Sequence, residues 1–129
     1  MIGGFDENDS DSWTTTEMVD KNGAILGPNL PWGFTNHCVA KIDEVTAIII
    51  GGSYKPSATL WLELYYDHFN STTEGPKLNG YGRINHACAT IRADNGSIYV
   101  IAAGGLVVSG NVVLDTSEIL SEDGWHPGK

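Results

Sequence analysis

The fold is decided by two short apolar stretches that each end at a pair of glycines, Ala47-Ile48-Ile49-Ile50-Gly51-Gly52 and Ile98-Tyr99-Val100-Ile101-Ala102-Ala103-Gly104-Gly105. Both stretches are rich in aliphatic and β-branched residues. Short continuous apolar runs bounded by turn residues are typical of strands that are buried on both faces. Each stretch is therefore predicted to be an interior strand that ends at its glycine pair.

Working outward from these stretches, four features recur in a fixed order: a glycine pair, a glutamate, a Gly-Pro-x-Leu segment and an Asn-His pair. The glycine pairs are spaced 48 and then 53 residues apart. Such self-similarity defines a repeat of about 50 residues. The repeated features are Gly3-Gly4, Gly51-Gly52 and Gly104-Gly105; Glu17, Glu63 and Glu118; Gly27-Pro28 with Leu30 and Gly75-Pro76 with Leu78; and Asn36-His37 and Asn85-His86.

The remaining segments of each repeat are also predicted to be strands. Threonine, aromatic and aliphatic residues dominate residues 14–19, 60–66 and 113–120, and a further strand is expected at residues 37–42 and 86–91. Asn95-Gly96 is typical of a hairpin turn, because both residue types tolerate positive φ. No window of helical length keeps a 3.6-residue apolar period free of Gly and Pro. The sequence therefore predicts an all-β architecture of antiparallel hairpins.

A repeat of this length with four short strands is typical of one blade of a β-propeller. The repeats resemble kelch repeats, in which a glycine pair ends an inner strand, a Glu-containing strand follows, and a Gly-Pro-x-Leu segment leads to the next copy. The stretch from Glu118 to Trp125 resembles the kelch segment that runs from Glu to a characteristic Trp, and Arg83 matches an arginine common in kelch blades, with Phe34 in its place in the other copy. The resemblance implies four-stranded antiparallel blades of a kelch-type β-propeller.

The sequence is too short to close such a ring by itself. Propellers typically have about 4–8 blades, whereas this chain is expected to hold one blade-like repeat at residues 1–52, a second at 53–105 and the start of a third at 106–129. End blades in an incomplete ring have bare apolar faces, because each blade buries its faces against its neighbours. We therefore expect a fragment of a longer protein, with self-association through exposed blade faces as the alternative.

Composition excludes several classes of partner. Lys plus Arg number 7 and Asp plus Glu number 16, so the net charge is −9. Nucleic acids and anionic membranes favour basic surfaces, and neither is expected as a partner. No apolar run approaches the roughly 20 residues that cross a bilayer. The first residues, MIGGFDENDSDS, lack the basic and apolar regions of a signal peptide.

The two cysteines lie close to two histidines in the sequence, which raises the question of a zinc site. Cys38 directly follows His37, and Cys88 comes two residues after His86. Along a strand, the first pair points to opposite faces and the second pair shares a face, so the two pairs are not expected to converge on one ion. The cysteines could form a disulfide, but we interpret them as two small buried hydrophobes. No metal or other cofactor is predicted.

The carboxylates are predicted to be structural. Glu17, Glu63 and Glu118 hold the same place in successive repeats, and we expect each to stabilise its blade by bonding to backbone or arginine. The acidic stretch at residues 6–11 is interpreted as a solvated loop, with calcium binding as the alternative, although it lacks the glycine and glutamate of an EF-hand loop. Copper oxidation on a propeller needs tyrosines, histidines and a cysteine from several blades. No such set is recognised, so the chain is not expected to be an enzyme.

Binding is the function class that the sequence favours. In kelch rings, ligands usually meet the loops at one end of the central channel, which here implies the loops after each glycine pair and before each Asn-His pair. Trp, Tyr and Arg are common interface anchors, and packing of the aromatic residues between blades is the alternative. The predicted partner-binding residues are Arg83, Trp32, Phe34, Tyr81, Ser53, Tyr54 and Lys55.

The main hypothesis is accordingly a non-catalytic protein-protein interaction scaffold with an unidentified protein partner. The alternatives are a copper-dependent oxidase-type propeller enzyme and a secreted carbohydrate- or matrix-binding module. Three N-glycosylation acceptor patterns, at Asn8, Asn70 and Asn95, favour a secreted or cell-surface parent protein. Asn95 also has the turn role described above.

Overall fold

The computed structural model describes residue 3 and residues 14–31, 33, 35–44, 46–53, 63–67, 72–79, 82–107 and 111–128. Every regular element in these residues is a β-strand, and all the strand pairs are antiparallel. The predicted all-β architecture is therefore confirmed. In the described part of the chain, no helix is long and apolar enough to cross a membrane.

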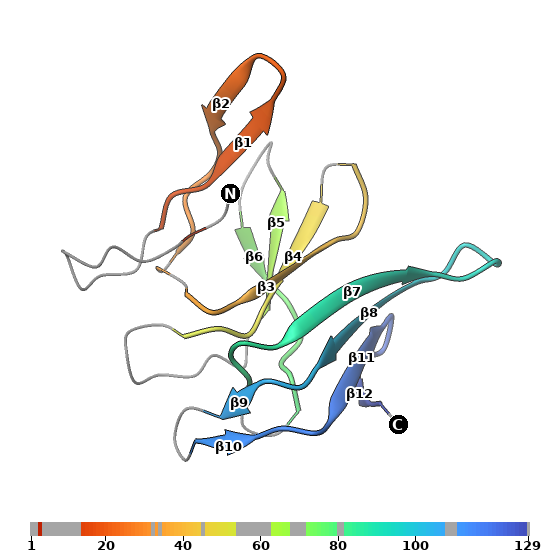
Figure 1. Cartoon of the computed structure of the whole chain (residues 1–129). Coiled ribbons are helices and arrows are strands. Elements are labelled where there is room, and N and C mark those ends of the chain that lie inside the picture. The colour runs from red at the N-terminus through yellow and green to blue at the C-terminus, as the bar shows by residue number, and fades with distance from the viewer. Residues whose placement is uncertain are drawn as a thin grey trace.

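Two four-stranded antiparallel sheets and two hairpins make up the structure (Figure 1). The first sheet has the order β3 (Cys38–Lys41), β4 (Thr46–Ile50), β5 (Glu63–Asp67) and β6 (Thr72–Glu74). The second sheet has the order β7 (Ala87–Arg92), β8 (Ile98–Ala103), β11 (Ser117–Ser121) and β12 (Gly124–Pro127). An N-terminal hairpin, β1 (Glu17–Asp20) with β2 (Gly23–Leu26), projects away from both sheets, and β9 (Leu106–Val107) pairs with β10 (Val112–Val113). No closed ring of sheets is formed by the described residues.

The repeat in the sequence is also a repeat in the backbone. Ile50 pairs with Cys38 in the first sheet, and Ala103 pairs with Ala87 in the second, each directly before a glycine pair. The first glycine of each pair adopts positive φ, +58° at Gly51 and +67° at Gly104, and so does the Asn of each Asn-His pair. The predicted repeat boundaries after residues 52 and 105 fall inside the sheets, following the second strand of each.

The main core lies between the two sheets, because both place apolar side chains on the surfaces that meet. Ile48 and Ile50 are fully buried, and Val100 and Ala102 are at most 2% exposed. The alternation of side chains along a strand puts every second residue of β4 and β8 on the shared interface. The buried core cluster consists of Ala40, Ile48, Ile50, Leu78, Val100, Ala102, Leu120 and Trp125.

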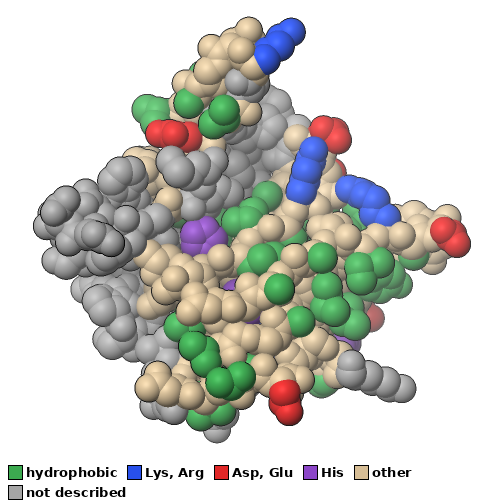
Figure 2. Space-filling view, in the orientation of Figure 1, with side chains coloured by type: hydrophobic (Ala, Val, Ile, Leu, Met, Phe, Trp, Pro, Cys, Tyr) green, Lys and Arg blue, Asp and Glu red, His purple; other side chains and the backbone are tan. Residues whose placement is uncertain are grey.

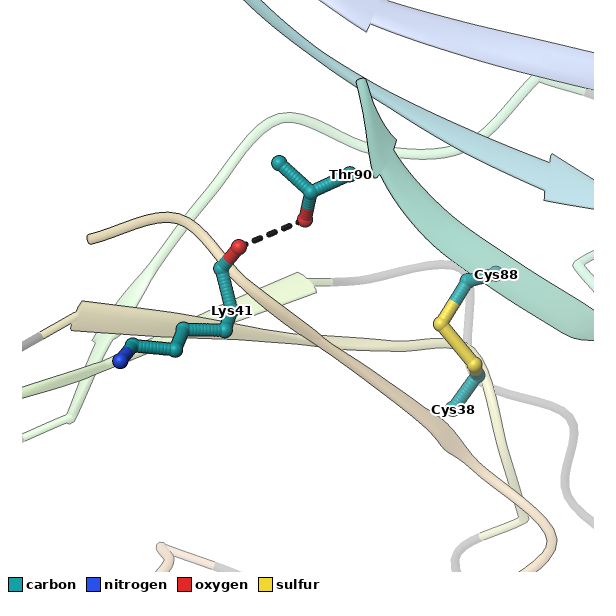
Figure 3. The surroundings of a disulfide bond; sticks show 4 residues. All are labelled: Cys38, Lys41, Cys88 and Thr90. Carbon is teal, nitrogen blue, oxygen red and sulfur yellow. Dashed lines mark hydrogen bonds between the residues drawn. A yellow bond between two sulfur atoms is a disulfide. The ribbon is translucent and has the colours of Figure 1, made fainter. Parts of the chain in front are cut away.

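A disulfide between Cys38 and Cys88 joins β3 to β7, with a Cα–Cα distance of 6.0 Å (Figure 3). Our interpretation of two free, buried cysteines is therefore wrong. β3 and β7, the first strands of the two sheets, lie side by side, so side chains on their facing sides can come into contact. Further along the same strands, the Thr90 hydroxyl donates to the Lys41 carbonyl at 2.6 Å, and Arg92 donates to the carbonyl of Ile42.

The predicted turn at Asn95-Gly96 connects β7 and β8. Gly96 adopts a φ of +86°, and its amide donates to the Ala93 carbonyl at 2.9 Å. The Asn95 side-chain oxygen accepts a hydrogen bond from the Ser97 amide at 3.0 Å. The side chain of this glycosylation candidate thus already helps to hold the turn.

Candidate functional site

Four segments meet where the sheets approach their glycine pairs, and we call this region the loop end: residues 35–37, 51–53, 82–86 and 104–106. Within the first repeat, Thr35 and Ser53 exchange backbone hydrogen bonds of 3.1 and 2.8 Å. Within the second, Ile84 and Leu106 do the same at 3.0 and 2.9 Å. The described residues after each glycine pair and before each Asn-His pair are therefore paired through their backbones.

Two further backbone bonds connect the repeats at the loop end. The Gly52 amide donates to the Arg83 carbonyl at 2.9 Å, and the Asn85 amide donates to the Asn36 carbonyl at 3.0 Å. Four segments that are far apart in the sequence thus form one continuous backbone surface.

Arg83 is placed in the interior of the second repeat rather than on its surface. The residue is 2% exposed, and its Nη1 donates to the carbonyls of Gly104 and Thr116 at 2.9 and 3.1 Å. Its Nη2 forms an ion pair with Glu118 Oε1 at 2.8 Å, while Glu118 Oε2 accepts from the Asn79 amide at 2.7 Å. The expected structural role of this glutamate, bonding to arginine and backbone, is confirmed. Both terminal nitrogens of the Arg83 guanidinium are bonded within the chain and its buried Nε has no hydrogen-bond partner among the described residues, so the side chain does not present an exposed anchor in this structure.

The histidines of the Asn-His pairs pack on the glycine pairs, a contact that sequence reasoning missed. A Cβ placed on Gly52 would lie 2.8 Å from the Cβ of His37, and one placed on Gly105 would lie 2.9 Å from the Cβ of His86. Real Cβ atoms do not approach so closely, and the carbonyl oxygens of Thr35 and Ile84, respectively, would lie at most 2.9 Å away, so the close approach of the neighbouring backbone requires a glycine at both positions. The co-occurrence of the two motifs in each repeat was the available signal.

Electrostatics keeps His86 neutral at ordinary pH. Burial, then the nearby Arg83 guanidinium and the His37 ring, together lower the pKa of His86 from 6.5 to about 4, against an opposing contribution from a hydrogen bond with the Ile50 backbone. The group is 9% exposed. A neutral imidazole beside a buried guanidinium avoids placing two positive charges together in a region of low dielectric.

The other predicted binding residues are placed as follows. Ser53 lies in the loop end but is only 4% exposed. Its partner-binding role and that of Arg83 remain predictions. Five of the predicted residues lie outside the described residues: Trp32, Phe34, Tyr54, Lys55 and Tyr81.

A polar depression of about 370 Å³ lies at the other end of the second sheet, where β8 begins and β11 ends. Sequence reasoning did not identify it, because its residues come from two turns that are distant in the sequence. It combines hydroxyl groups, exposed carboxylates and one aromatic ring. Its lining residues are Ser97, Ile98, Tyr99, Ser121, Glu122 and Asp123.

No group of three or more His, Cys, Asp or Glu side chains in the described residues is arranged to hold a metal ion. Cys38 and Cys88, which entered the zinc hypothesis, are joined in the disulfide. The acidic stretch considered for calcium lies outside the described residues.

Comparison with known proteins relates the structure to a lectin. No protein-family model and no curated protein matches the sequence. Among solved structures, the chain is similar to a fucose lectin from Kordia zhangzhouensis in complex with methyl-fucoside, with a TM-score of 0.64 and 12% sequence identity. The likeness covers 98% of this chain and 87% of the lectin chain. At this identity the comparison establishes the fold.

The comparison also corrects the resemblance drawn from the sequence. The glycine pairs, the glutamates and Trp125 were matched to kelch repeats and hence to a kelch-type propeller. The structural likeness to a fucose lectin over nearly the whole chain, together with the lack of a family match, shows that this assignment was wrong. Double glycines after a strand satisfy a backbone requirement that unrelated β-repeats share, so the motif did not identify the family.

Proposed function

We propose that the chain is a non-catalytic carbohydrate-binding module. The observation that carries the proposal is the whole-chain structural likeness to a lectin that was solved with methyl-fucoside bound. Carbohydrate binding was one of the alternatives that the sequence left open, and the likeness supports it over a protein-interaction scaffold.

The polar depression offers chemistry that suits a sugar. The exposed carboxylates of Glu122 and Asp123 can accept hydrogen bonds from sugar hydroxyls, and the hydroxyls of Ser97 and Ser121 can donate and accept. The half-buried ring of Tyr99 provides an apolar surface against which the C–H face of a sugar can pack. A volume of about 370 Å³ is within the range of small-molecule sites.

The disulfide supports a secreted or cell-surface location for this function. Disulfides form and persist in oxidising compartments and are rare in the cytosol. Cys38 and Cys88 link the two sheets, so the cross-link stabilises the arrangement of the strands that carry the depression.

The test is titration calorimetry of the full-length chain with methyl-fucoside and a panel of other monosaccharides. We expect saturable binding of at least one sugar, and binding at least about tenfold weaker after Tyr99→Ala or Asp123→Asn. Asp115→Asn, an exposed carboxylate that does not line the depression, is the matched control and should bind as the wild type does.

Two further outcomes distinguish an error in the location of the site from an error in the proposed function. Loss of binding in Trp32→Ala or Tyr81→Ala, with Tyr99→Ala unaffected, would retain carbohydrate binding but assign it to the sequence segments that precede the Asn-His pairs. No binding of any sugar by the oxidised wild-type chain would overturn the proposal.

A further inference from the structure

The second sheet has one covered face and one open face. Val100 and Leu120 point into the core between the sheets and are 2% and 6% exposed. The residues that alternate with them lie on the opposite side of the sheet, where Ile91 is 48% exposed and Ile101 and Ile119 are half-buried. We call this surface the open face; its aliphatic residues are Ala87, Ala89, Ile91, Ile101, Ala103 and Ile119, and the register also places Tyr99 and His126 on it. Figure 2 shows hydrophobic side chains gathered over β7 and β8.

The first sheet shows what such a face packs against. By strand register, Ala89 and Ile101 of the second sheet correspond to Ala40 and Ile48 of the first. Ala40 is 3% exposed and Ile48 is fully buried, because the second sheet covers them. Ala89 is exposed and Ile101 is half-buried. The same type of surface is thus covered in one repeat and uncovered in the next.

The surroundings of the two glycine pairs differ in the same way. A Cβ on Gly51 would meet the Arg83 carbonyl oxygen at 2.4 Å, which belongs to the following repeat. A Cβ on Gly104, the equivalent glycine, would meet only the Leu114 carbonyl oxygen, at 3.7 Å. Among the described residues, nothing beside the second sheet takes the place that the following repeat has beside the first.

The N-terminal hairpin carries the complementary surface. Its register aligns Val19 and Ala24 with Leu120 and Trp125, the residues with which the second sheet covers the first. Leu120 is 6% exposed and Trp125 is 7% exposed, whereas Val19 is 70% exposed and Ala24 is also exposed. The hairpin thus presents to solvent the side that is buried between sheets in the equivalent strands.

We propose that the Val19 side of the N-terminal hairpin of one copy packs on the open face of the second sheet of another copy, in a head-to-tail association. This contact repeats between molecules the sheet-to-sheet contact that the chain makes within itself, using equivalent residues on both sides. Among the described residues, the open face carries no Asp, Glu, Lys or Arg, and His126 is its titratable side chain, so the repulsion between chains of net charge −9 is weak there. The inference does not depend on carbohydrate binding.

Sedimentation velocity of the oxidised full-length chain over a wide concentration range tests the association. We expect a mass that rises with concentration above the 13.8 kDa of one chain. Ala89→Arg on the open face and Val19→Glu on the hairpin should each weaken association at least about tenfold, because each places a charge in an apolar contact. Val113→Glu is the matched control, since Val113 is 74% exposed but belongs to neither surface.

Mixing the two variants tests the geometry. A head-to-tail contact predicts that Ala89→Arg and Val19→Glu chains, each monomeric alone, form a dimer when mixed, since one junction retains wild-type residues on both sides. If Val19→Glu associates like the wild type while Ala89→Arg does not, a two-fold contact between open faces replaces the proposal. A wild-type chain that stays monomeric at every concentration overturns it. Circular dichroism should show all variants folded, and Ile91→Lys substitutes for Ala89→Arg if that variant is not.

Discussion

The two four-stranded sheets have the same strand order and register, yet they are stabilised differently. The first sheet lies within apolar packing, with Ile48, Ile49 and Ile50 at most 1% exposed. In the second sheet, the counterparts Ile101 and Ala103 are only half-buried.

The second sheet has a buried ion pair. Arg83 and Glu118 tie its first, second and third strands together through bonds to Gly104, Thr116 and each other. In the sequence, Phe34 takes the place of Arg83 in the first repeat. The comparison teaches that the repeated glycines and Asn-His pairs set the backbone, whereas the side chains that differ between copies decide how each sheet is stabilised.

The largest expected effect comes from breaking the ion pair of the second sheet. Arg83→Ala leaves the Glu118 carboxylate buried without its cation and should lower the free energy of unfolding by about 3–5 kcal/mol, measured by urea denaturation. The control is Lys41→Ala, which removes an exposed ion pair with Glu44 and should lower the free energy of unfolding by at most about 1 kcal/mol. Equal losses in the two variants would mean that the second sheet does not depend on its ion pair.

Removing the disulfide tests how strongly the two sheets are joined. The free energy of unfolding of the Cys38→Ser/Cys88→Ser double variant should be lower by about 2–4 kcal/mol. The cross-link joins residues 50 positions apart and therefore restricts the conformations of the unfolded chain. Hydrogen exchange should accelerate in β3 and β7 in the variant and in the reduced wild type alike. Unchanged exchange in both would show that the core alone holds the sheets together.

Acidification should lower the stability of the fold through His86, which lies in the loop end. Because the pKa of His86 is about 4 when folded and near 6.5 when unfolded, the unfolded chain binds an extra proton between these values. The free energy of unfolding should therefore decrease as the pH falls from about 7 to about 4, with His86 contributing at most about 3 kcal/mol. Urea midpoints of the wild type and His86→Gln, taken across this range, measure the contribution.

The matched control is His126→Gln at an exposed position, which should keep the wild-type pH dependence. A His86→Gln variant with the full wild-type dependence would contradict the assignment of this effect to His86.

The smallest effect compares the two glycine pairs directly. Both Gly51→Ala and Gly104→Ala place a side chain at positive φ, which costs about 1–2 kcal/mol. Gly51→Ala should lower the free energy of unfolding by at least about 1 kcal/mol more than Gly104→Ala. The new Cβ at residue 51 would collide with the Arg83 carbonyl oxygen, whereas the new Cβ at residue 104 would lie 3.7 Å from the Leu114 carbonyl oxygen, an ordinary contact. Thermal unfolding at low protein concentration measures both. Equal costs would show that the following repeat is not packed against Gly51 as described.

The sequence predicted much of the backbone but little of the tertiary pairing. Apolar runs that end at Gly51 and Gly104 located the interior strands, because strand burial and turn chemistry are local properties. The expectation that Glu118 bonds to arginine also depended only on its repeated position. Both predictions used sequence patterns and did not depend on how the two sheets pack against each other.

The failures involve contacts between repeats. Cys38 and Cys88 are not equivalent to each other; by register, their counterparts are Ala87 and Val39. An argument from equivalent positions therefore could not reveal that adjacent sheets place these two cysteines face to face. Arg83 was predicted to be a partner-binding anchor, yet its terminal nitrogens bond to two carbonyls and a carboxylate inside the second sheet.

The disulfide has a consequence for proteolysis. Lys77 is exposed and lies between Cys38 and Cys88 in the sequence. Trypsin that cuts after Lys77 would leave two fragments in one covalent molecule, which separate on a gel only after reduction. Limited digestion without reductant would thus overstate how intact the chain remains, and a purified preparation could carry a concealed break.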